Sequence, residues 1–465
     1  MRTATKRSSA LAVLLALTLG AAACGGDDGQ DDPTRPAADE EVDLDADVTI
    51  KVGDLPPASE PEEREFFEGQ VEAFMQAHPN ITVEAGEEIW DVQTFQAKLA
   101  AGDLPDVLAV PFTEANSLAE RGQIAELSQA MDLAGVSADL NPDLVGLVSS
   151  DDGGVYAIPT AAQALGLIYN RDLFEQAGLD PDDPPRTWDD VRAAARQITE
   201  ATGATGFATM TTENQGGWML AAGVYSFGGT IENPEGSEAT FADQPAADYL
   251  ELLRAMRWED QSMGSNFLYN AAGLVEDFSA GRVGMFIGFS GLYRPAVIRN
   301  EMPAERFGMG PMPVGGDSDP TALTGGVIQV VSPDATPEQR VAAVRWIDFF
   351  YLGQFTDETV AVAQASAGAT AGQAVTVPER PAVSQEAYDQ YFEWIAPYLN
   401  VPITNFDTYI QAFGEQTLQP EPAVKAQEVY SELDVVVQQV LTDEGADVET
   451  VLDEAATAVD RLLSR

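Results

Sequence analysis

The sequence predicts an α/β protein, and two observations lead to this prediction. From residue 48 onward, short apolar or alternating segments that are typical of strands are followed by longer segments with apolar residues at helical spacing. The resulting strand–helix–strand–helix–strand order implies parallel strand pairing with right-handed crossovers. With 465 residues and a hydrophobic content of 45%, the chain is long enough for two or three domains with full cores.

The first α/β unit is predicted to begin at residue 48. Its elements, in chain order, are a strand at 48–52, a helix at 63–78, a strand at 81–83, a helix at 92–101 and a strand at 106–110. Ligands of such sheets bind beyond the carboxyl ends of the strands. This rule directs attention to the loops at 53–60 and 111–116.

A second unit is predicted to begin with an apolar strand at 164–169 and a short helix at 171–178. Thr187 and Thr336 each precede a helical segment and have a carboxylate or an amide three residues on, which indicates capping boxes. The other elements predicted in this part are helices at 218–222, 271–280 and 448–463 and strands at 283–287 and 327–331.

The first 23 residues have the features of a signal peptide. Three basic residues precede a short apolar run at 11–19, and small residues then lead to Cys24. The apolar run is too short to span a membrane comfortably. Because the small residues and Cys24 resemble a lipobox, we expect residues 1–23 to be removed and Cys24 to carry a lipid. An ordinary secreted protein with one unpaired cysteine is the alternative.

The chain is strongly acidic, with 76 acidic and 24 basic residues and a formal net charge of -52. Such a surface lacks the cations that release phosphate counterions, so we expect no nucleic-acid partner. The simplest explanation of the charge is solubility in salty or alkaline surroundings, where screening weakens self-repulsion. Residues 24–45 belong to the most acidic stretch and are predicted to be a solvated tether.

The residues required by most enzyme mechanisms are missing from the sequence. His78, the only histidine, stands in a His-Pro-Asn helix stop, and no zinc motif, nucleophile elbow or phosphate-binding glycine loop is present. We therefore expect no catalysis, no metal and no cofactor. Paired carboxylates remain available among so many acidic residues, which leaves a glycosidase open as an alternative.

Six segments in order along residues 48–463 resemble the extracellular solute-binding proteins of ABC importers, in the carbohydrate-binding family that includes maltose-binding protein. The segments are "FMQAHPNITV" (74–83), "KLAAGDLPDVLAV" (98–110), "LAERGQIAEL" (118–127), "YAIPTAAQALGLIYNRDLFEQAGLDPDDPPRTWDDV" (156–191), "FSAGRVGMFIGFSG" (278–291) and "GGVIQVVSPDATPEQRVAAVRWIDFF" (325–350). Each segment alone is weak, and their shared order carries the resemblance.

The resemblance implies a two-lobed, periplasmic-binding-protein-like α/β fold of type II, with a hinge that the chain crosses several times. The implied division is 46–158 and 313–368 in lobe 1, and 159–312 and 369–465 in lobe 2. The first crossing would lie at Ile158-Pro159-Thr160. Asn170-Arg171-Asp172, just after the first strand of lobe 2, are then expected to be turn and capping groups.

The resemblance also implies a solute site between the lobes, because sugars need aromatic planes for their ring faces and polar groups for their hydroxyls. The residues that fall at or beside the family's contacts are Phe112, Glu114, Gln163, Glu213, Trp218, Phe289, Ser290, Tyr293, Gly325, Gly326 and Tyr409. No tryptophan stands near Phe289, where the family usually carries a stacking one. Structural roles remain the alternative, namely packing for the aromatic residues, helix capping for Glu213 and a solvated surface for Glu114.

The expected function is binding without turnover. A monomeric, lipid-anchored protein at the extracellular face of the cell membrane would capture a carbohydrate between its lobes and deliver it to ABC permease subunits. A polyamine, peptide or polyol is the alternative solute, and a cell-surface glycosidase or a sensory or adhesive lipoprotein is the alternative class of protein.

Overall fold

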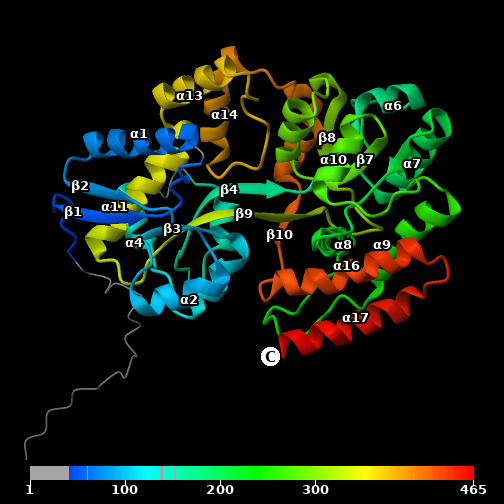
Figure 1. Cartoon of the computed structure of the whole chain (residues 1–465), viewed down its shortest axis with the longest axis horizontal. Helices are drawn as coiled ribbons and strands as arrows, with labels where there is room; N and C mark the ends of the chain where they lie inside the picture. Colours follow the sequence, from blue (N-terminus) through cyan, green and yellow to red (C-terminus); the bar gives the residue numbers. More distant parts are fainter. Residues whose placement is uncertain (1–40, 60, 137–139, 151–152, 465) are drawn as a thin grey trace, which may run out of the picture.

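Two β-sheets with helices packed against them form two lobes, which lie side by side in Figure 1. The computed structural model describes residues 41–59, 61–136, 140–150 and 153–464. The predicted signal peptide, the lipidation at Cys24 and most of the predicted tether lie outside these described residues. The predicted α/β class with two lobes is confirmed.

The larger sheet belongs to lobe 1, and the smaller sheet belongs to lobe 2. The larger sheet has the strand order β10–β9–β3–β1–β2, with β4 paired to β9, and consists of β1 (Val48–Val52), β2 (Ile81–Ala85), β3 (Val107–Pro111), β4 (Ile158–Ala164), β9 (Thr321–Val331) and β10 (Thr417–Pro420). The smaller sheet has the order β6–β7–β5–β8 and consists of β5 (Gly166–Asn170), β6 (Thr205–Phe207), β7 (Val283–Gly288) and β8 (Phe307–Pro311). β1 pairs in parallel with β2 and β3, as predicted, whereas β9 runs antiparallel to β3.

Helices cover the sheets and make up most of the C-terminal part of the chain. Those of the first half are α1 (Pro61–Ala77), α2 (Val92–Ala101), α3 (Ala115–Glu120), α4 (Ser128–Ala134), α5 (Pro142–Leu147), α6 (Arg171–Ala177), α7 (Trp188–Thr202) and α8 (Gln215–Ser226). Those of the second half are α9 (Gln244–Arg254), α10 (Ala271–Ser279), α11 (Pro337–Ile347), α12 (Gly353–Thr356), α13 (Glu358–Thr370), α14 (Gln385–Ile395), α15 (Asp407–Gln411), α16 (Ala426–Thr442) and α17 (Val448–Leu463). The predicted elements agree with these bounds to within a few residues, except that β9 and α8 extend well beyond the segments predicted for them.

Local sequence explains where several helices begin. Asn170 caps α6, because its side chain accepts a hydrogen bond from the backbone N–H of Leu173 at 3.2 Å. The side chain of Thr187 likewise caps α7. At α11 both halves of the capping box between Thr336 and Gln339 are present.

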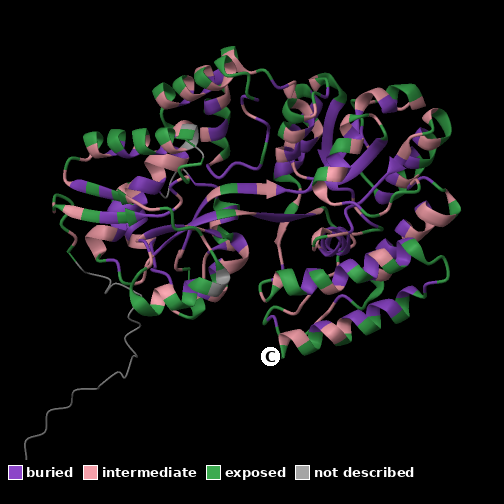
Figure 2. Ribbon diagram, in the orientation of Figure 1, coloured by how far each residue is buried: buried purple, intermediate pink, exposed green. Residues whose placement is uncertain are grey.

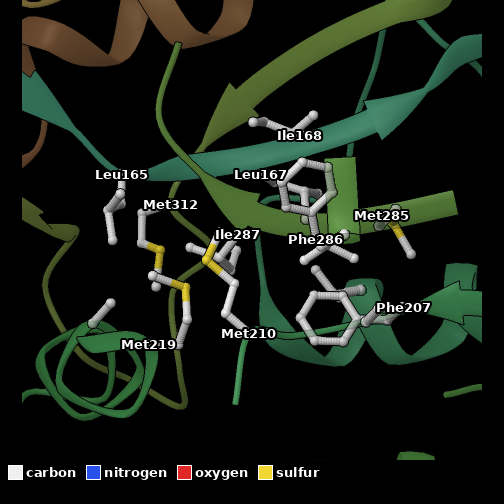
Figure 3. Close-up of a cluster of buried hydrophobic side chains, with 14 of the residues drawn as sticks. Leu165, Leu167, Ile168, Phe207, Met210, Met219, Met285, Phe286, Ile287 and Met312 are labelled. Carbon is white, nitrogen blue, oxygen red and sulfur yellow. The ribbon is translucent and has the colours of Figure 1, made fainter. Parts of the chain in front are cut away.

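Each lobe has its own apolar core, and the strands β5, β7 and β8 of lobe 2 are buried along their whole length (Figure 2). In lobe 1 the alternation along β3 places Val107 in the cluster on one face of the sheet and Leu108 in the cluster on the other. The core of lobe 2 contains Met210, Met219 and Met312 together with leucine, isoleucine and phenylalanine side chains (Figure 3).

The chain passes between the lobes along β4 and β9, which pair with each other across the centre of the molecule (Figure 1). Ile158 at the start of β4 packs in the core of lobe 1, whereas Ala164 at its end packs in the core of lobe 2. The crossing expected at residues 158–160 is therefore the beginning of β4. Leu418 of β10 packs against clusters of both lobes, so a third strand lies at the hinge.

Helix α14 departs from the predicted division of the chain. Tyr388, Tyr391 and Ile395 pack in the core of lobe 1 together with Trp346, although residues 369–465 were expected in lobe 2. The aromatic face of α14 explains this placement, because it packs on Phe355 at ring-centroid distances of 6.1 Å for Tyr388 and 4.9 Å for Tyr391. The helices α16 and α17 do pack in the core of lobe 2.

Candidate functional site

The carboxyl ends of strands from both lobes face the hinge. In lobe 1, β1 and β3 are parallel, so their ends lie on one edge of the sheet. In lobe 2, Gly166 at the start of β5 pairs with Gly288 and Pro311, the last residues of β7 and β8. Since β5 directly follows the hinge strand β4, these two strand ends also lie at the hinge, where α/β sheets bind ligands.

An aromatic pair stands on the lobe 2 side of this edge. Trp218 in α8 and Phe289, directly after β7, have ring centroids 6.2 Å apart in an edge-to-face arrangement. Both side chains are partly exposed while they pack against the lobe core. They are the predicted aromatic residues that keep accessible ring surface.

Gln163, Gly325 and Glu421 meet at the hinge beside the aromatic pair. Gln163 of β4 pairs with Gly325 of β9. A side chain at Gly325 would bring its Cβ to 3.5 Å from Oε1 of Glu421 and 3.9 Å from Nε2 of Gln163. The carboxylate of Glu421 and the amide of Gln163 therefore lie near each other beside the backbone of β9 at Gly325.

Glu421, directly after β10, was not predicted as a site residue. Desolvation raises its pKa to about 7, and the nearby indole N–H of Trp218 opposes this shift. That indole nitrogen does not reach full hydrogen-bond geometry with any described residue. No local motif marks Glu421 in the sequence, because β10 joins the sheet only through its pairing with β9.

Gly326 follows Gly325 and has a φ of 151°, a conformation that other residues rarely adopt. A Cβ at this position would lie 2.1 Å from the carbonyl oxygen of Ala161 on the neighbouring hinge strand. Gly326 is thus required for the close approach of β4 and β9.

Two carboxylates stand after the strands of lobe 1. Asp54 follows β1, its Oδ2 accepts a hydrogen bond from the N–H of Ala109 at 3.0 Å, and desolvation raises its pKa to about 6. Glu114 follows β3 and is partly exposed, and desolvation raises its pKa while Arg121 opposes the shift. These groups make the lobe 1 side of the edge acidic.

A further acidic residue, Glu379, lies in the segment before α14, where its backbone N–H donates to the hydroxyl of Tyr388 at 3.4 Å. The side chain of Glu379 is exposed, yet the surrounding protein desolvates its carboxylate enough to raise the pKa to about 7 despite the opposing charge of Arg294. Sequence patterns did not indicate this residue.

Besides Gly325, four predicted site residues are buried in this structure. Phe112, Ser290, Tyr293 and Tyr409 are each at most 7% exposed. Tyr293 packs on Phe307 with ring centroids 5.2 Å apart, and the hydroxyl of Tyr409 donates to the carbonyl of Ala164 at 2.9 Å. The three aromatic residues among them therefore present no open ring face to a solute in this structure.

Glu213 is exposed at the turn before α8. Its carboxylate accepts a hydrogen bond from Nδ2 of Asn270 at 3.0 Å, and its φ of 61° is left-handed. It is not the N-cap of α8, which is Asn214. Glu213 is therefore accessible at the ligand edge of lobe 2, and its contact with a solute stays a prediction.

Three cavities of about 290, 600 and 330 Å³ lie away from this edge. The first is lined by Asp106 at the start of β3, and the second by Asn170 at the far end of β5.

Among the described residues, no group of three or more histidine, cysteine, aspartate or glutamate side chains is arranged to hold a metal ion. No helix in the same part of the chain is both long and apolar enough to cross a membrane.

A two-lobed α/β fold with polar and aromatic groups gathered at a shared hinge defines a class of binding proteins. The sequence profile of bacterial extracellular solute-binding proteins matches residues 58–352. The chain belongs to this family, and it is accordingly a solute-binding protein of an ABC importer.

Two related sequences have different names, and only one of these names states a solute. A Brucella abortus protein named only as a binding protein is 26% identical over 295 residues, which is 62% of this chain and 68% of the relative. The sn-glycerol-3-phosphate-binding periplasmic protein UgpB of the same species is 34% identical over 111 residues, or 22% of this chain and 25% of the relative.

Solved structures agree in fold. The cyclic alpha-maltosyl-1,6-maltose binding protein of Arthrobacter globiformis has a TM-score of 0.67 at 22% identity, covering 90% of this chain and 99% of its own. UgpB of Mycobacterium tuberculosis, in complex with glycerophosphocholine, has a TM-score of 0.67 at 18% identity, covering 90% and 98%. At these identities the likeness establishes the two-lobed fold.

Proposed function

We propose that the protein captures a sugar or oligosaccharide between its lobes and delivers it to the permease subunits of its importer. The observation that carries this proposal is the pairing of accessible aromatic rings, Trp218 and Phe289, with the hydrogen-bonding groups of Gln163 and Glu421 at the hinge. Rings of this kind match the apolar face of a pyranose, and the carboxylate and amide match its hydroxyls.

Solute capture would act through the hinge. A sugar that contacts Trp218 in lobe 2 and Glu114 or Asp54 in lobe 1 makes its full set of contacts only when the lobes approach each other. Binding then shifts the population toward the closed form, which is the form that the permease would receive. No covalent chemistry is required, in line with a family of binding proteins.

The proposal is tested by calorimetry and thermal shift of residues 25–465 against a panel of mono- and oligosaccharides. One sugar should bind saturably, and at a hundred times its dissociation constant it should add about 2.7 kcal/mol of stability. Trp218→Ala should weaken that binding at least tenfold because a stacking surface is lost. Trp394→Phe, in the lobe 1 periphery, serves as the matched control. Absence of binding by every sugar would overturn the carbohydrate assignment.

The same experiment separates binding from glycosidase activity. A binding protein returns its ligand intact, whereas a glycosidase consumes it, so the sugar is recovered after prolonged incubation and examined by mass spectrometry. Cleavage at a rate above the protein-free control would favour the enzyme.

A glycerol phosphate solute is the second candidate, because the stretch shared with UgpB is 34% identical. Phosphate binding calls for arginine, lysine or backbone N–H groups. Asp54, Glu114 and Glu421 instead make the edge acidic, which disfavours an anion. Titration with sn-glycerol-3-phosphate decides between the two, and tight binding of this anion together with silence toward sugars would establish the second candidate.

Anchoring through Cys24 and a monomeric state are parts of the same proposal. Cells that express the full chain should incorporate labelled palmitate into it, and Cys24→Ala should abolish this label and release the protein from the membrane fraction. A membrane-bound Cys24→Ala variant would contradict lipid anchoring. Sedimentation of residues 25–465 at several concentrations tests the monomer.

A further inference from the structure

Gln329 of β9 is a fully buried polar residue in the larger sheet. It is 0% exposed, and neither its Nε2 nor its Oε1 reaches a hydrogen-bond partner among the described residues. Leaving a buried amide unpaired costs free energy, so such groups nearly always have a partner. The amide of Gln329 therefore calls for a polar group that the described part of the chain does not supply.

Gln329 belongs to a row of residues that crosses the sheet of lobe 1. Ala109 of β3 is its direct partner in the antiparallel pairing of β3 and β9, which places the two Cβ atoms about 5 Å apart on one face. On the other side of β3 the chain continues from β1 to Asp54. Oδ2 of Asp54 accepts a hydrogen bond from the N–H of Ala109 at 3.0 Å. Ala109 thus lies between Asp54 and Gln329.

The row lies where this face of the sheet opens to solvent. Along β9, Val331 is buried in the core of lobe 1, whereas Val327, on the same face and nearer the hinge, is 39% exposed. Gln329 stands between these two residues. Ala109 beside it is partly exposed, although its strand is otherwise buried on both sides of this position. A solute at the hinge can therefore reach the sheet at Ala109, next to the amide of Gln329.

We propose that Gln329 is a specificity-determining residue, whose amide hydrogen-bonds a hydroxyl of the sugar that lies over Ala109. The inference rests on the proposed function and deepens it, because it requires a sugar that presents two adjacent hydroxyls to lobe 1. Asp54 accepts a hydrogen bond from one hydroxyl, and Gln329, which both donates and accepts, pairs with its neighbour. A sugar that lacks the second hydroxyl leaves the amide unpaired and is rejected.

A trapped water is the alternative partner of Gln329. Tyr351, in the helical turn after α11, has a phenol whose pKa is raised by desolvation and by the charge of Asp54, while the amide of Gln329 opposes the shift. The phenol and the amide are thus near each other, but they do not reach hydrogen-bond geometry. A water that bridges them permanently would make Gln329 a structural residue.

Gln329→Met separates the two roles, since methionine keeps the length of the unbranched side chain and removes both hydrogen-bonding atoms. Calorimetry of residues 25–465 with glucose, galactose, mannose, maltose and maltotriose identifies a bound sugar. Gln329→Met should weaken the binding of that sugar at least tenfold. The melting temperature of the ligand-free variant should stay at or above that of the native chain, because an unpaired buried amide is removed. Gln390→Met, at an exposed position of α14, should change neither quantity.

Deoxy analogues of the bound sugar identify the hydroxyl that is read. In the native chain, removal of one hydroxyl should weaken binding at least tenfold. In Gln329→Met, the same analogue should bind as tightly as its parent sugar, because the amide that recognised the hydroxyl is gone. A deoxy penalty that persists undiminished at every position in Gln329→Met would assign the hydroxyls to other residues and overturn the inference.

The outcomes distinguish this inference from the proposed function. If Gln329→Met binds the sugar as tightly as the native chain does, the inference fails and the carbohydrate proposal stands, and a lowered melting temperature would then identify the bridging water. If affinity and melting temperature both fall, the deoxy analogues decide. Absence of binding by every sugar overturns both proposals.

Discussion

Gly326 shows how strongly a single residue constrains the hinge. Its φ of 151° and the 2.1 Å that would separate a Cβ from the carbonyl of Ala161 leave no room for any side chain. We expect Gly326→Ala to lower the free energy of unfolding by at least about 2 kcal/mol, through backbone strain and loss of the close strand contact. Urea unfolding followed by tryptophan fluorescence measures the change.

The neighbouring glycine is the matched control. At Gly325 the nearest atom to an added Cβ is 3.5 Å away, which is an ordinary van der Waals distance. Gly325→Ala should therefore leave the free energy of unfolding within about 0.5 kcal/mol of the native value. Equal losses in the two variants would refute the role assigned to Gly326.

Asp54 makes stability depend on pH. Desolvation raises its pKa to about 6 from the ordinary value of 3.8, so its contribution to stability is fully present below pH 3.8 and is lost as the pH rises through 6. Asp54→Asn cannot ionise and also suits the left-handed φ of 66° at this position. We expect this variant to exceed the native chain in stability by roughly 1–2 kcal/mol at pH 8, with the gain shrinking toward pH 4.5.

Urea unfolding between pH 4.5 and 8 measures this difference. Asp103→Asn removes the same charge at an exposed position and should show no comparable pH dependence. A gain for Asp54→Asn that is constant across this range would mean that backbone conformation alone, and not ionisation, explains it.

Among the helices, α11 begins with a complete capping box between Thr336 and Gln339. Thr336→Ala should cost about 1 kcal/mol, since the backbone N–H of Gln339 loses its acceptor. Thr457→Ala, at an exposed position within α17, should be neutral or slightly stabilising because alanine is the better helix former. Thermal and urea unfolding of both variants provide the comparison, and equal effects would show that the cap is dispensable.

The whole molecule carries a net charge of -52, and this charge opposes its own compact state. Raising NaCl from 10 mM to 0.5 M shortens the range of the repulsion to a few ångströms. The melting temperature of residues 25–465 should rise by at least about 3 °C over this range and then level off. A rise that begins only above 1 M would instead indicate salt exclusion from the surface.

The arrangement of the whole chain explains why α14 and Glu421 escaped prediction. The aromatic residues of α14 predict an apolar face, but a sequence pattern does not say which of two lobes that face will meet, and the structure places it in lobe 1. Glu421 reaches the hinge because β10 pairs with β9, about a hundred residues earlier in the chain. The partners of both elements are set by contacts distant in sequence.

The sequence by itself determined the elements and their class. The alternation of β1, the helical spacing of α17 and the caps at Thr187 and Thr336 depend on interactions within a few residues, and all of these are present in the structure. Only the tertiary structure decided which aromatic residues face the hinge. Trp218 and Phe289 keep exposed surface while Tyr293 and Tyr409 are buried, because burial depends on how separate elements pack and not on local spacing.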